Sequence, residues 1–144
     1  MANLTIVIVQ GNTSDGSLKL SDRDHTKARK SDNIKWKIAP HSRVECITDI
    51  KEKKSADDIW LEEPHKEGSH WAGKISPGAD VGDQYPYSIY WKAPGDKTIY
   101  IHDPIISIRP NTVHDLILQI VLIIFSGFLG FFTMQSLLKK KSGK

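Results

Sequence analysis

Histidine and acidic side chains in the middle of the chain are the first candidates for metal chemistry. His65 and His70 are five residues apart in a polar stretch that we expect to be a loop. Glu67 or the more distant Asp103 could complete a zinc site with them. No second pair of ligands at a metal-binding spacing occurs in the sequence. Solvated loop histidines therefore explain this stretch better, and we predict no metal ligands and no bound cofactor.

The His102–Asp103 pair and the single cysteine, Cys46, are the other candidates for chemistry. Neighbouring residues on a strand point to opposite faces, so His102 and Asp103 are not expected to exchange a proton. A lone cysteine allows no disulfide within the chain, and Cys46 lies in an apolar run typical of a small buried hydrophobic residue. The sequence has neither a Gly-x-Ser-x-Gly elbow nor a phosphate-binding loop between a strand and a helix. We therefore predict that the protein is not an enzyme and has no catalytic residues.

Strand patterns dominate the first 111 residues. Ile34–Ile38 alternates apolar and basic residues, and Tyr85–Trp91 alternates aromatic and smaller ones. The turn at Ala93–Asp96 makes residues 98–102 the expected hairpin partner of the second strand. Further strands are expected at 4–9, 18–20, 44–50 and 105–108, and only 55–63 could hold a short helical turn. This spacing predicts that residues 1–111 form a soluble all-β domain, an antiparallel Greek-key sandwich.

Two stretches of these strands carry a resemblance to a known fold. Asp32-Asn33-Ile34-Lys35-Trp36 is followed by Pro40-His41 and Val44, and a Tyr-rich strand, Tyr87–Trp91, comes later. With the last strand at 105–108, this order resembles the cupredoxin-like sandwich, the fold of plastocyanin-type domains, over roughly residues 3–110. The chain also resembles small bacterial domains of this kind, through Trp71–Ile75 and Asp103–Ile106.

The copper ligands of that family are missing. A blue-copper site uses two histidines and a cysteine thiolate, with a weak axial methionine. The resemblance would place the cysteine near Trp91, whereas Cys46 lies on another expected strand. The methionines are Met1 and Met134, at the start of the chain and in its apolar C-terminal segment. The resemblance therefore implies a cupredoxin-like domain that does not bind copper.

The sequence from Leu116 to Leu138 contains 23 residues and no charge. At the helical rise it reaches roughly 34 Å, enough to cross the hydrocarbon core of a bilayer. Asp115 precedes it and Lys139-Lys140-Lys141 follow it. We predict a single transmembrane helix with a short collar over residues 112–138, followed by a basic tail at 139–144.

Charge is distributed unevenly between the domain and this tail. The chain has 20 basic and 17 acidic residues, for a net charge of +3, but four of the lysines lie in the last six residues. The remainder is slightly acidic, which disfavours nucleic-acid binding. The C-terminal lysines favour a cytoplasmic C-terminus by the positive-inside rule. The N-terminal segment lacks the pattern of a secretory signal, however, and this favours a tail-anchored protein with a cytoplasmic domain. We adopt the second orientation without excluding the first.

Two surfaces are candidates for association. In the membrane segment, Ser126 and Gly130 form a small-xxx-small pair, with Gly127 beside them and Gln119 able to add a hydrogen bond between helices. In the domain, most aromatic side chains are expected in the core, but either Tyr90 or Tyr100 could be exposed and join a binding surface.

These features predict a tail-anchored, non-catalytic binding or recruitment module whose partners are the bilayer and either another protein or a second copy of the chain, bound through its membrane helix. One alternative is a membrane-acting effector, as in bacterial defence, in which the sandwich senses a ligand and clustered helices perturb the bilayer. A weaker alternative is an exported, metal-binding cupredoxin relative.

Overall fold

The protein is described by a computed structural model that covers residues 1–111, 120, 121 and 124. The chain divides into two compact units, Met1–Arg109 and Pro110–Lys144. Within the described residues, no helix is long and apolar enough to cross a membrane. The predicted basic tail and most of the predicted membrane segment lie outside the described residues, including the proposed association residues Gln119, Ser126, Gly127 and Gly130.

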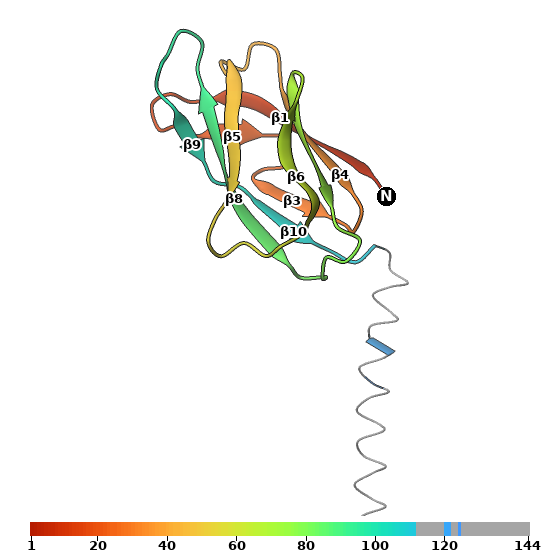
Figure 1. The fold of residues 1–144 in the computed structure, drawn as a ribbon. Coiled ribbons are helices and arrows are strands. Elements are labelled where there is room, and N and C mark those ends of the chain that lie inside the picture. Colours follow the sequence, from red (N-terminus) through yellow and green to blue (C-terminus); the bar gives the residue numbers. More distant parts are fainter. Residues whose placement is uncertain (112–119, 122–123, 125–144) are drawn as a thin grey trace, which may run out of the picture. The chain divides into compact units, whose positions relative to one another are not determined.

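Residues 1–111 form a two-sheet β-sandwich (Figure 1). One sheet has the strand order β2-β1-β4-β7-β6, and the other has the order β3-β10-β8-β5, with β9 also paired to β8. The bounds are β1 Asn3–Gly11, β2 Leu18–Leu20, β3 His25–Ala28, β4 Asn33–Ile38, β5 Cys46–Glu52, β6 Trp60–Glu67, β7 His70–Ile75, β8 Gln84–Lys92, β9 Tyr100–His102 and β10 Ile105–Ile108. The predicted all-β, sandwich-like domain is therefore confirmed.

The sandwich is not purely antiparallel, which corrects the predicted topology. Strand β1 pairs in parallel with β4, from Asn3 opposite Asn33 to Ile8 opposite Ile38. Strand β3 pairs in parallel with β10. The chain leaves the first sheet after β2, forms β3 in the second sheet and returns to the first sheet at β4. The parallel pairings follow from this crossing.

Several strands were predicted well and others were not. The β8–β9 hairpin forms, with Trp91 opposite Tyr100, and β10 has the predicted bounds. The prediction of a helical turn at 55–63 is wrong, because β6 begins at Trp60. The expected loop around His65 and His70 is also wrong, since these residues lie on the β6–β7 hairpin. Strand β3 was not predicted.

Alternation along the central strands builds the core between the sheets. Tyr85, Tyr87, Ile89 and Trp91 of β8 are all buried, while the second and fourth residues of β4, Ile34 and Trp36, point inward from the facing sheet. Residues i and i+2 of a strand share a face, so β8 delivers two tyrosines and a tryptophan to one layer.

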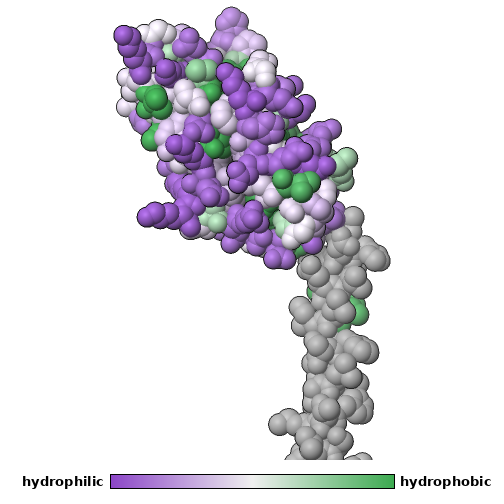
Figure 2. Space-filling view, in the orientation of Figure 1, coloured by the Kyte–Doolittle hydropathy of each residue, from purple (hydrophilic) through white to green (hydrophobic). Residues whose placement is uncertain are grey.

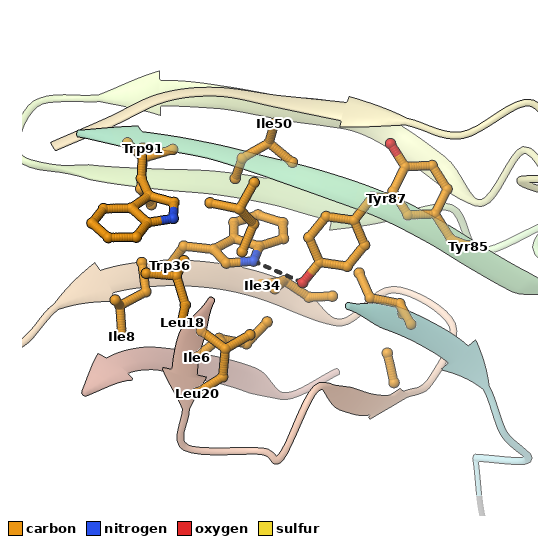
Figure 3. Close-up of a cluster of buried hydrophobic side chains, with 14 of the residues drawn as sticks. Ile6, Ile8, Leu18, Leu20, Ile34, Trp36, Ile50, Tyr85, Tyr87 and Trp91 are labelled. Carbon is orange, nitrogen blue, oxygen red and sulfur yellow. Dashed lines mark hydrogen bonds between the residues drawn. The ribbon is translucent and has the colours of Figure 1, made fainter. Parts of the chain in front are cut away.

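An aromatic cluster joins the two sheets at the centre of this core (Figure 3). Trp36 Nε1 donates a hydrogen bond to the buried Tyr87 hydroxyl at 3.1 Å, and their rings meet edge to face at 6.0 Å. The Tyr85 ring stacks on Tyr87 at 5.7 Å and meets Trp60 at 5.2 Å. Such contacts add to the burial of large apolar surfaces, so this cluster is a main source of stability.

The buried tyrosines make the fold sensitive to alkali. Burial raises the pKa of Tyr85 to about 12 and raises that of Tyr87 as well. An unfolded tyrosine ionises near pH 10. The unfolded state therefore loses these protons first, so the contribution of these tyrosines to the free energy of unfolding is constant below about pH 10 and falls as the pH rises from about 10 towards 12. Urea unfolding across this range should show the fall, and Tyr85→Phe should reduce it. An equal fall in both proteins would contradict this assignment.

Candidate functional site

A groove of about 780 Å³ opens beside the β1–β2 hairpin. Its floor consists of the end of β1, at Gln10 and Gly11, together with strand β2. The 12–17 loop and the Arg23–Asp24 turn adjoin these strands in the sequence, whereas Arg43 and His102 of β9 reach the groove from distant parts of the chain. Four chain segments therefore meet at one polar hollow.

The 12–17 loop is closed by its own hydrogen bonds. Asn12 N donates to Ser17 O at 2.8 Å, and Gly16 N donates to Asn12 O at 2.9 Å. The Asn12 carbonyl oxygen of the side chain accepts from Ser14 N at 2.9 Å, and Asp15 accepts from Ser17 N and Oγ at 2.9 and 2.7 Å. The Ser17 hydroxyl bond is the main cause of a lowered pKa at Asp15. One rim of the groove is thus held in a fixed shape.

The core fixes the same loop from below. Trp91 is fully buried, and its Nε1 donates to Gly16 O at 2.9 Å. Gly16 has a φ of 79°, a left-handed conformation that suits glycine, and the Tyr100 ring packs against it. The rings of Trp91 and Tyr100 are 4.7 Å apart. The position of the groove rim is therefore tied to the packing of the sandwich.

His102 connects the wall of the groove to its floor. Its Nδ1 accepts a hydrogen bond from Leu18 N at 3.2 Å, so the proton of the neutral ring lies on Nε2. Nε2 donates to Asp24 Oδ1 at 2.6 Å. Both ring nitrogens are occupied, and neither is free to take a proton from a nucleophile. His102 in this arrangement holds Leu18 and Asp24 in position and does not act as a general base.

The histidines weighed for metal binding are not brought together with Asp103. His70 lies 3.4 Å from Glu67, and the Nδ1 atom of His65 is 2.8 Å from the Glu63 carbonyl oxygen. Asp103 instead accepts from Ser88 Oγ at 2.7 Å and forms an ion pair with Lys53 at 3.2 Å. The Ser88 bond is the main cause of the lowered pKa of Asp103. In the described part of the chain, no three His, Cys, Asp or Glu side chains converge as metal ligands would.

The two tyrosines proposed for an exposed surface lie on opposite faces of one sheet. Tyr100 is the cross-strand partner of buried Trp91 and shares its face, whereas Tyr90 precedes Trp91 and faces the other way. Both side chains are half-buried. Tyr100 donates to Asp96 at 2.5 Å, and the Lys51 ammonium lies 5.4 Å from the centre of the Tyr90 ring. They do not form one binding surface.

Cys46 is half-buried rather than buried, because it begins the edge strand β5. It lines a separate cavity of about 250 Å³ with Trp71 and His70. Trp71 Nε1 donates to Ile47 O, another residue of the lining, at 3.3 Å. This cavity is about a third of the size of the groove beside the hairpin.

Apart from His102, which was weighed for proton transfer, the groove residues were missed by the sequence analysis. Arg23, Asp24 and Arg43 lie in polar turns with no motif, and Asn12 lies in an ordinary Asn-Thr-Ser-Asp turn. The only signal in the sequence was weak. It consisted of cationic residues inside turns rich in Ser and Asp, next to predicted strands. Their convergence depends on the pairing of the strands.

No protein-family model matches the chain, and no curated protein matches its sequence. Among solved structures, the chain is similar to the crystal structure of a cysteine protease inhibitor from Entamoeba histolytica. The two are 14% identical, the match covers 76% of this chain and 97% of that chain, and the TM-score is 0.34. The similarity is distant and carries no argument about function.

Proposed function

We propose that the chain is a membrane-anchored, non-catalytic binding module whose sandwich holds its ligand in the groove beside the β1–β2 hairpin. The observation that carries this proposal is the construction of the groove. Its rim is fixed by Trp91 and its wall by the Leu18–His102–Asp24 contacts, while its cationic side chains, Lys19, Arg23 and Arg43, form no ion pair within the described residues. A rigid frame with unpaired polar groups is what a preorganised binding site requires.

The non-catalytic part of the proposal rests on His102. A histidine that accepts with one ring nitrogen and donates with the other cannot also activate a hydroxyl or thiol. Cys46 lies on β5 and lines a different cavity. The chemistry of the groove is therefore recognition.

The membrane part of the proposal rests on the uncharged 23-residue segment Leu116–Leu138. The sandwich faces the cytoplasm, and the face containing Ser126 and Gly130 brings copies together in the bilayer. The sandwich is a cupredoxin relative without copper ligands, in which Trp91 of the core stands where the family has its cysteine. We propose the orientation, the association of copies and the cupredoxin relationship together with the anchor.

Membrane extraction tests the anchor. The full chain should remain in the membrane pellet after alkaline carbonate treatment. Phe128→Arg/Leu129→Arg should release it, because each arginine at the centre of a helix costs about 2.5–3.5 kcal/mol on insertion scales. The control Phe128→Leu/Leu129→Phe keeps the same composition and should remain in the pellet. Release of the unaltered chain by carbonate would overturn the anchor.

Protease protection tests the orientation. If the sandwich is cytoplasmic, a protease added to intact cells should leave it uncut, and the same protease should cut it after lysis. Cleavage in intact cells would place the sandwich outside and would favour the exported alternative.

A further inference from the structure

We propose that the groove binds a small ligand through a phosphate group, with Arg23, Arg43 and Lys19 supplying the positive charge. This inference rests on the proposed function, because it names the ligand class of the same groove. The three cationic side chains come from a turn after β2, a turn before β5 and β2 itself. They surround a hollow whose size suits a small molecule.

The charges in the groove are not balanced by the protein. Lys19, Arg23 and Arg43 are exposed, and in the part of the chain that the structure describes none of them forms an ion pair. The carboxylate that lines the groove, Asp24, is bonded to His102 at 2.6 Å. Asp24 keeps its negative charge, so the three cationic side chains leave the groove lining with a net charge of about +2, although the chain up to residue 115 carries a small net negative charge. An anion would find unpaired donors here.

The backbone holds both arginines in an unusual conformation. Arg23 has a φ of 56° and Arg43 a φ of 63°, and Asp24 beside the first arginine has a φ of 68°. Left-handed conformations cost non-glycine residues about 1–3 kcal/mol and persist where the surrounding structure enforces them, often at ligand sites. Arg23 N donates to Leu20 O at 3.2 Å, and Ser42, the residue before Arg43, accepts from Gly11 N at 2.8 Å, so both turns are bonded to the sheet. Glycine or asparagine would suit both positions better if only the turns mattered.

Neutral donors complete the site. The side-chain oxygen of Asn12 is used within the loop by Ser14, which leaves the Asn12 amide NH₂ as a donor at the rim. Two guanidinium groups, an ammonium and an amide match the several oxygens of a phosphate better than the two oxygens of a carboxylate. A long nucleic acid would need an extended basic surface, which this slightly acidic sandwich does not have. One face of the sandwich is mostly hydrophilic, with small scattered apolar areas (Figure 2).

The test is calorimetric titration of the full chain in nonionic detergent with inorganic pyrophosphate. The key variant is Arg23→Asn/Arg43→Asn, because asparagine tolerates the left-handed conformation and should leave the fold intact. Its affinity for pyrophosphate should fall at least about tenfold, as expected when charge-assisted hydrogen bonds are lost. The control Lys54→Asn/Arg109→Asn removes two exposed positive charges elsewhere and should change the affinity less than about twofold.

Two results would overturn the proposal: no binding of pyrophosphate by the unaltered chain, or equal affinities for the unaltered chain and the arginine variant. The second would show that pyrophosphate binds elsewhere on the chain. Circular dichroism and thermal melting of the variant verify that it is folded. Neither result alters the outcome of carbonate extraction. A wrong ligand class can therefore be distinguished from a wrong assignment of the membrane anchor.

The source of the phosphate is distinguished in nanodiscs. With a free ligand, the affinity for pyrophosphate should be the same in discs of phosphatidylcholine alone and in discs that also contain phosphatidic acid. With a lipid headgroup as ligand, phosphatidic acid should compete and weaken the binding of pyrophosphate. Either result supports phosphate recognition by the groove.

Discussion

Replacing Trp91 with alanine is expected to lower the free energy of unfolding by about 3–5 kcal/mol. The side chain is fully buried between the sheets, where it packs against Tyr100 and holds the 12–17 loop through Gly16 O. The substitution removes the largest kind of core side chain and leaves a cavity. Urea unfolding of the full chain measures the loss.

Trp91→Phe separates the effect of the lost hydrogen bond from the effect of the lost side-chain volume. Phenylalanine keeps an aromatic ring but leaves Gly16 O without its donor, which costs about 1–3 kcal/mol when the acceptor is buried. Amide hydrogen exchange should also become faster at Gly16 and Leu18, because both amides bond within the structure that Trp91 supports. Unchanged exchange at these amides would show that the groove rim does not depend on the core.

Gly11→Ala is expected to destabilise the fold by about 1–3 kcal/mol through overpacking. A Cβ atom at this position would lie 2.7 Å from the Trp91 ring and 2.8 Å from Val44, closer than real contacts allow. Gly11 also lines the groove, so its floor must shift. Thermal or urea unfolding measures the effect.

Gly78→Ala is the control, since its nearest neighbour would be Ser76 Oγ at 3.5 Å, an ordinary contact. Its stability should stay within about 0.5 kcal/mol of the unaltered chain. In a Trp91→Phe background, Gly11→Ala should cost less, because the clashing outer ring atoms of the indole are gone. Equal costs in both backgrounds would contradict the assigned clash.

Strands that alternate cleanly could be predicted from the sequence. Tyr85–Trp91 and Ile34–Ile38 each present one apolar face, and that pattern is sufficient to identify a strand facing a core. Strand β6 could not be identified in this way. It is an edge strand of largely exposed, charged residues with Pro64 in its middle, and these features protect an edge while hiding the strand pattern.

Most of the groove lining lies between residues 10 and 24, but Arg43 and His102 reach it from distant parts of the sequence, and this convergence could not be predicted. Leu18 and His102, which bond across its floor and wall, are 84 positions apart. Leu18 lies on β2 beside β1 and His102 lies on β9 beside β8, in different sheets, and no local pattern in the sequence specifies that these two strands come together. Local turn chemistry accounts only for the 12–17 loop, where the side chains of Asn12 and Asp15 accept hydrogen bonds from backbone amides two residues ahead.

The central claim is that the groove beside the β1–β2 hairpin is the binding site, and mapping amide chemical shifts by NMR tests it most directly. The full chain in detergent micelles would be titrated with pyrophosphate. The account predicts that the largest shifts occur at the amides of Asn12, Arg23, Asp24 and Arg43, with small shifts on β6 and β7. Largest shifts at Lys139–Lys141, or on the surface of the β6–β7 hairpin, would contradict it.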